Sequence, residues 1–144
     1  MTTSALVQNC TFTQGYWKNH PGVWPVPSLT LGTVAYTQAQ LLAIFGQPAA
    51  GNGLISLAHQ LIAAKLNIAN GADPTAISAT ILAADALIGG LVVPPVGAGF
   101  LAPASTSALT QALDDYNNGL TGPGHCGETP ARTATWGQVK TLYR

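Results

Sequence analysis

The sequence LISLAHQLIAAKLNIA, from Leu54 to Ala69, carries the clearest secondary-structure signal in the chain. Apolar residues recur there every three or four positions, which is the spacing that places side chains on one side of a helix. Asn70-Gly71 follows directly and is typical of a helix end. We therefore predict that this segment is the main helix of the fold and that it buries Leu54, Leu57, Ala58, Leu61, Ala64 and Ile68.

The segments on both sides of this helix also have start and stop signals. Upstream, Thr37-Gln38-Ala39-Gln40 matches a capping box, which predicts a helix that runs to Phe45 and ends at Gly46. Downstream, Asp73-Pro74 predicts a helix start, because aspartate is a favoured cap and proline suits the first helical position. That helix is expected to end at Gly89-Gly90 and to pack through Ile77, Ile81, Ala84 and Ile88.

A fourth helix is expected from about Ser105 to Asn117, with Asn118-Gly119 as its stop. It follows an apolar, proline-rich connector, residues 91–103, that has no regular period. The side chains expected to face inward are those of Leu109, Ala112, Leu113 and Tyr116.

The region before residue 37 is expected to hold smaller elements. Thr13 can cap a short helical turn through Asn19, and the three prolines from Pro21 to Pro27 favour an extended segment. Two short runs, residues 29–31 and 34–36, flank Gly32-Thr33 and predict a hairpin. The sequence thus predicts a mainly α fold: a small bundle of about four helices with a minor β-hairpin and Pro/Gly-rich loops.

The chain is poor in charge. Charged residues make up 7% of its 144 residues, against about 25% in an ordinary soluble domain, and its formal net charge is zero. Copies of such a protein repel one another weakly, so the composition favours self-association. Lys and Arg number only five and form no basic run, which excludes nucleic-acid binding through the phosphate backbone.

A membrane span is not expected either. The longest apolar stretch, residues 81–100, is interrupted by Asp85, Gly89-Gly90 and Pro94-Pro95, whereas a span needs about 20 uninterrupted apolar residues. Residues 1–8 have neither the basic start nor the apolar run of a signal peptide. The chain is therefore expected to be either cytosolic or a trimmed mature form.

Both cysteines, Cys10 and Cys126, lie near the ends of the predicted helical region. Because the ends of a domain are often close in space, a bridge between them is geometrically reasonable. In the chain-entropy model it would stabilise the fold by about 4–5 kcal/mol, and it would imply export. Two alternatives remain open: a pair of buried free thiols in a cytosolic protein, and a catalytic Cys126 thiol assisted by His125.

The three histidines, His20, His59 and His125, are the candidate metal ligands. Three imidazoles with an open fourth position would suit zinc or copper. A bridge between the cysteines would bring His20 and His125 into one neighbourhood. His59 lies within the apolar helix, where a histidine is more often a core or rim residue with one hydrogen bond. No HxxxH or HExxH pair supports metal binding, so no cofactor is otherwise expected.

No spacing in the chain matches a catalytic motif. Asp114-Asp115 is the one carboxylate pair, and neighbouring positions on a helix face different ways. The isolated charges of Lys65 and Asp85 are expected to form a structural ion pair. The sequence therefore favours a role other than catalysis and offers no catalytic residue.

Aromatic residues provide a further candidate surface. Tyr16, Trp17 and Trp24 could form a platform that stacks on sugar rings, although the favoured interpretation is that Tyr16 and Trp17 close the core beneath the cysteines. Near the other end, Thr135-Trp136-Gly137-Gln138 matches a capping box and predicts a short helix. The residues that this helix would present to the domain or to a partner are Trp136, Val139 and Tyr143.

The block CTFTQGYWKNHP, which begins at Cys10, and the block GPGHC, which ends at Cys126, resemble an uncharacterised domain that recurs in exported and cell-surface proteins of bacteria. The segment AHQLIAAKLN between them belongs to the same resemblance. The resemblance implies export and a Cys10–Cys126 disulfide, and it transfers no activity. Residues 134–144 resemble a short C-terminal tail of exported proteins.

These observations predict a secreted or cell-surface protein with three parts. Residues 1–9 are an extension, residues 10–126 a helical domain whose ends a disulfide joins, and residues 127–144 a tail with a short helix. The expected role is structural, as a self-assembling extracellular filament or coat subunit whose partners are copies of itself or other cell-surface proteins. The alternatives are a zinc or copper protein that uses the three histidines and a glycan-binding module that uses the aromatic rings.

Overall fold

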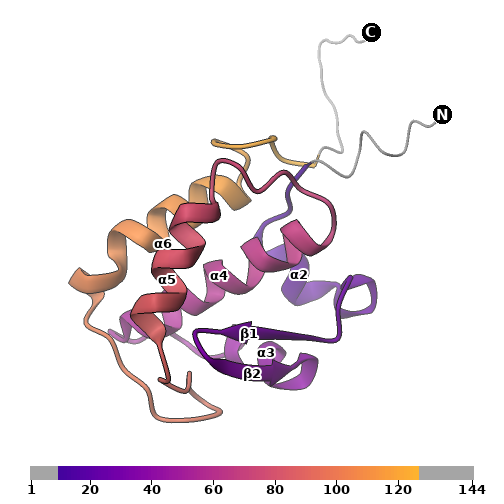
Figure 1. Ribbon diagram of the computed structural model, residues 1–144. Helices are drawn as coiled ribbons and strands as arrows, with labels where there is room; N and C mark the ends of the chain where they lie inside the picture. Colours follow the sequence, from indigo (N-terminus) through magenta and orange to yellow (C-terminus); the bar gives the residue numbers. More distant parts are fainter. Residues whose placement is uncertain (1–9, 127–144) are drawn as a thin grey trace, which may run out of the picture.

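The computed structural model describes residues 10–126, which form five α-helices, one short 3-10 helix and a two-stranded hairpin (Figure 1). In chain order the elements are α2 (Gln14–Asn19), η1 (Pro21–Val23), β1 (Ser28–Leu31), β2 (Val34–Thr37), α3 (Gln38–Phe45), α4 (Gly53–Ala69), α5 (Ser78–Ile88) and α6 (Pro103–Asn117). The predicted mainly α class and the hairpin are confirmed. The helix count exceeds the predicted four by one because the turn after Thr13 is itself a short helix, α2.

Helix α4 lies at the centre of the fold. It packs against α2, α3, α5, α6 and β1, and Figure 1 shows it crossing the middle of the molecule. The predicted apolar side is buried except for the half-buried Ile68, but Ile55, Ile62 and Leu66 are buried as well. Since its neighbours cover it on several sides, α4 is a central buried helix rather than one with a single packed side.

The hairpin and the helix that follows it form as their local signals predict. At the start of α3, the Thr37 hydroxyl accepts from the Gln40 backbone amide (3.2 Å) and the Gln40 side chain accepts from the Thr37 amide (2.9 Å). The strands pair antiparallel from Ser28↔Thr37 to Leu31↔Val34. Gly32 has a φ of 63°, and a Cβ there would overlap the carbonyl of Gly89, so only glycine fits this turn against the end of α5.

Helix α5 begins later than the predicted start at Asp73-Pro74. Asp73 and Pro74 precede the helix, which begins only at Ser78. The Asp73 carboxylate accepts from the amide (2.9 Å) and the hydroxyl (2.7 Å) of Thr75, and these bonds lower its pKa. The amides of Ile77 and Ser78 both donate to the Pro74 carbonyl (2.9 and 2.8 Å), which closes a separate turn. The aspartate thus caps this turn instead of the helix.

Two other boundaries also differ from expectation. Residues 21–23, expected to be extended, form η1, because the fixed backbone angle of proline also suits a 3-10 turn. Helix α6 starts at Pro103, two residues earlier than predicted, with proline in its first turn. Leu113 and Tyr116 are buried as expected, whereas Leu109 and Ala112 are half-buried. None of the helices within residues 10–126 is long and apolar enough to cross a membrane.

The predicted ion pair between Lys65 and Asp85 is confirmed, with Nζ 2.9 Å from Oδ2. Lys65 also donates to the carbonyl of Thr30 (2.6 Å), and Asp85 accepts from the amide of Gly32 (2.9 Å). Each side chain is about a fifth to a quarter exposed, at 18% and 26%. The pair therefore joins α4, α5 and the hairpin at one point.

Candidate functional site

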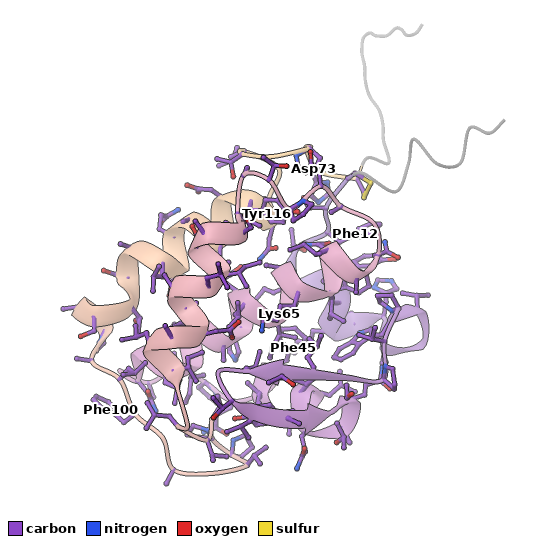
Figure 2. All side chains as sticks on the ribbon, viewed as in Figure 1. Phe12, Phe45, Lys65, Asp73, Phe100 and Tyr116 are labelled. Atoms are coloured by element: carbon purple, nitrogen blue, oxygen red, sulfur yellow. A yellow bond between two sulfur atoms is a disulfide. The ribbon has the colours of Figure 1, made fainter. Side chains whose placement is uncertain are left out.

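The two terminal blocks meet and form one unit, which we call the clasp: residues 10–20 together with residues 122–126. A disulfide joins Cys10 to Cys126, so the free-thiol and catalytic-thiol alternatives do not hold. Next to it, Thr11 and His125 form a parallel β-bridge. The Thr11 amide donates to Gly124 (2.8 Å), and the Cys126 amide donates to Thr11 (2.7 Å). Figure 2 shows the disulfide in yellow where the two ends of the domain meet.

Thr11 fastens the clasp to the end of α6. Its hydroxyl is buried and lies 3.0 Å from the carbonyl of Tyr116 and 3.1 Å from that of Asn117. The last carbonyls of a helix have no partner within the helix. That of Tyr116 also accepts from the amide of Gly119 (3.1 Å), so the Thr11 hydroxyl adds a further hydrogen bond at the end of α6. On the same turn of α6, the Tyr116 hydroxyl donates to the carbonyl of Asp73 (2.8 Å), and burial raises the pKa of Tyr116 to about 12.

Asn67 connects the clasp to the central helix. Its side-chain oxygen accepts from the amide of Phe12 (2.8 Å) and from the indole of Trp17 (3.1 Å). Its side-chain nitrogen donates to the carbonyl of Phe12 (2.9 Å) and to the side chain of Asn117 (3.0 Å). Asn117 in turn donates to the carbonyl and side chain of Gln60 (3.0 and 2.9 Å). These buried hydrogen bonds tie the N-terminal block to both α4 and α6.

Sequence reasoning did not find this network. Thr11, Asn67 and Asn117 are all buried polar residues, and none of them was a candidate. One signal was available for Asn67, because it lies three residues after Ala64 and so falls within the apolar stripe of α4. An amide in a buried stripe needs a specific partner, since burying it without one is costly.

The aromatic residues of the clasp do not form a shared exposed platform, which corrects the predicted glycan site. Trp17 is 0% exposed and lies in the core, as the favoured interpretation predicted. The half-buried Tyr16 stacks with Phe12 on one side (ring centroids 3.9 Å apart) and with His20 on the other (4.3 Å). Both faces of the Tyr16 ring are therefore already covered, and neither can stack on a sugar.

Trp24 is partly buried, and its side chain attaches the segment after η1 to the domain through two contacts. Its indole donates to the carbonyl of Trp17 (2.8 Å), and its ring meets Phe45 edge to face. Trp136, Val139, Tyr143 and the short helix predicted in the tail lie outside the described residues.

His59 is half-buried at the edge of the core and is not part of the clasp. It lies on α4, where its Nε2 donates to the carbonyl of Ile44 (2.7 Å) and its ring contacts Phe45. Burial lowers the pKa of His59 below the ordinary value of 6.5, although the hydrogen bond to Ile44 opposes this shift. The sequence predicted a core or rim residue with one hydrogen bond, and the half-buried His59 with its bond to Ile44 agrees with the rim position.

The other two histidines do share one neighbourhood. His20 and His125 both line a pocket of about 440 Å³ where the two terminal blocks meet, together with Phe12, Tyr16, Asn19 and Cys126. Within residues 10–126 no group of three or more His, Cys, Asp or Glu side chains could hold a metal ion. The predicted three-histidine site is thus not assembled, because His59 does not line this pocket and its Nε2 donates to the carbonyl of Ile44.

A second surface feature is the connector, which is the segment between the end of α5 at Ile88 and the start of α6 at Pro103. From Ala86 to Ala104 the chain has no polar side chain, yet several residues of this stretch face solvent. Phe100 is 58% exposed and Val96 is 37% exposed. In Figure 2, Phe100 lies at the opposite end of the molecule from the disulfide. The domain therefore presents an apolar surface at one end and the clasp at the other.

No family model, curated protein or solved structure matches this chain.

Proposed function

We propose that the chain is an exported structural subunit of the bacterial cell surface that associates with copies of itself through the connector between α5 and α6. The exposed Phe100, in a stretch without a polar side chain, is the observation that carries this proposal. Two of the five exposed large apolar side chains of the described residues, Val96 and Phe100, lie in this connector, and exposed apolar surface is typical of interaction sites. The partner that covers this connector is a second copy of the chain, because two surfaces with so little charge repel each other weakly.

The distribution of charge supports association. Residues 10–126 contain six charged side chains, and two of them, Lys65 and Asp85, neutralise each other. No charged residue lies between Asp85 and Asp114, which includes the whole connector. A partner that covers the connector would therefore not have to strip water from a charged group.

Two features support export. Disulfides persist in oxidising compartments, and the Cys10–Cys126 bridge closes almost the whole described chain. The resemblance of the two terminal blocks to exported bacterial domains points the same way. A filament or coat needs contacts at more than one place on each subunit, and a domain with distinct surfaces at opposite ends can supply them.

Sedimentation equilibrium at rising protein concentration, in EDTA, tests the association. We expect the native chain to form larger species and Phe100→Asp to weaken their formation at least about tenfold, because a buried Phe side chain contributes about 1.5–3 kcal/mol. Leu120→Asp is the matched control, since Leu120 is 76% exposed and lies outside the connector. A native chain that stays monomeric at high concentration, or equal effects of the two substitutions, would contradict the proposal.

A further inference from the structure

The pocket between the terminal blocks is lined by His20 and His125, and both residues are held in place by their neighbours. The ring of His20 is fixed by two contacts with the same residue: it stacks on Tyr16, and its Nδ1 lies 2.7 Å from the Tyr16 carbonyl oxygen. A carbonyl oxygen can only accept, so Nδ1 carries the proton. The neutral ring of His20 therefore keeps its lone pair on Nε2, the arrangement that a second-shell carbonyl imposes on metal-ligating histidines.

His125 is held just as firmly through its backbone. It pairs with Thr11, and the next residue is the bridged Cys126. Gly119 packs against it so closely that a Cβ at that position would overlap the His125 backbone nitrogen. The backbone of His125 therefore cannot move independently of the block that carries His20. A pocket lined by both residues can bind a ligand without first ordering a loop.

One chain does not place enough ligands in this pocket to complete a zinc site. Zinc is usually four-coordinate and is bound by histidine, cysteine and carboxylate side chains. The residues that line this pocket include two histidines and no carboxylate. Both cysteines are in the disulfide, and the Nε2 of His59 donates to the carbonyl of Ile44. One chain thus offers two imidazoles in this pocket, and two positions on the metal stay open.

We propose that His20 and His125 form half of a zinc site, and that the same two residues of a second copy complete it. Two copies related by a two-fold axis would present identical pockets to each other, so one metal ion would be held by four imidazoles. This inference rests on the proposed self-association and adds a second contact, at the clasp. Together with the contact through the connector at the opposite end, it would let copies join into a chain.

The test uses the full chain without a histidine tag and in the Phe100→Asp background, so that association through the connector does not mask the effect of the metal. Sedimentation equilibrium is measured in EDTA, in Zn²⁺ and in Mg²⁺, and bound zinc is counted after dialysis. We expect Zn²⁺ alone to convert monomers to dimers with about one zinc per two chains.

Substitutions assign the ligands. His20→Ala and His125→Ala should each weaken the zinc-dependent dimer at least about tenfold, and His59→Gln should leave it unchanged. Dimers that persist in either alanine variant would overturn the inference. So would the absence of a zinc effect, or one zinc per chain without dimerisation. Association of the native chain in EDTA tests the connector contact separately, so either proposal can fail without the other.

Discussion

Asn67 is the residue at which the contacts of the N-terminal block, α4 and α6 converge. Replacement by alanine would leave the part-buried Phe12 amide and the buried Trp17 indole and Asn117 side chain without this partner. Each unpaired buried group costs about 1–3 kcal/mol, so Asn67→Ala should lower the free energy of unfolding by about 3 kcal/mol or more. Urea unfolding followed by circular dichroism measures this loss.

The control for that experiment is Asn118→Ala. Asn118 is exposed, and within residues 10–126 its side chain donates to the carboxylate of Asp114 (3.0 Å). Its replacement should change the free energy of unfolding by no more than about 0.5 kcal/mol. Similar losses in the two variants would show that the buried network does not hold the domain as described.

His59 should make stability depend on pH. Its pKa is lowered in the folded protein, so the unfolded chain binds a proton more readily as the pH falls below 6.5. The free energy of unfolding should therefore be highest above this pH. It should decrease toward pH 5 by up to about 1.4 kcal/mol per pH unit. His59→Gln should flatten this slope. An equal dependence of the free energy of unfolding on pH between pH 7.5 and pH 5 in the native chain and in His59→Gln would refute the assignment.

Among the elements, the ion pair of Lys65 and Asp85 joins α4 to α5 and to the hairpin. Asp85→Ala removes the counter-charge of Lys65 and the acceptor of the Gly32 amide, and should lower the free energy of unfolding by about 2–3 kcal/mol. Asp85→Asn keeps an acceptor for that amide and should cost less. The double variant Lys65→Met/Asp85→Ala should cost less than the sum of the single changes. Strict additivity in urea unfolding would mean that the two charges do not interact.

Elements with local signals could be predicted from the sequence. The capping box at Thr37, the hairpin around Gly32-Thr33 and the period of α4 all depend on residues within one or two turns of each other. The start of α5 could not be predicted in this way. Asp73 has a competing local partner in Thr75, and its carbonyl receives a hydrogen bond from Tyr116 on a distant helix.

In the candidate site, too, one feature could be predicted from the sequence and another could not. The meeting of His20 and His125 could be predicted, because the cysteines nearby bring their blocks together. The pairing of Asn67 with Asn117 could not, since it depends on how α4 and α6 pack and the two residues lie 50 positions apart. The exposure of Phe100 in the connector could not be predicted, because an apolar run without a period does not reveal which side chains face solvent.

At the scale of the whole molecule, the clasp closes the domain as a unit. The disulfide and the bridge between Thr11 and His125 join the first block to residues 122–126. The hydrogen bonds of Thr11 and Asn67 join the same block to α6 and α4. The hydrogen bonds do not require the disulfide to form, so the domain should still fold without it. What the disulfide adds is a restriction of the unfolded chain across 116 residues.

The most direct test of the clasp compares the native chain with Cys10→Ser/Cys126→Ser in urea unfolding, with circular dichroism as the probe. We expect a folded variant with an unchanged helical signal, whose free energy of unfolding is lower than that of the native chain by about 2–5 kcal/mol. A variant as stable as the native chain would contradict the claim that the terminal blocks hold this domain together.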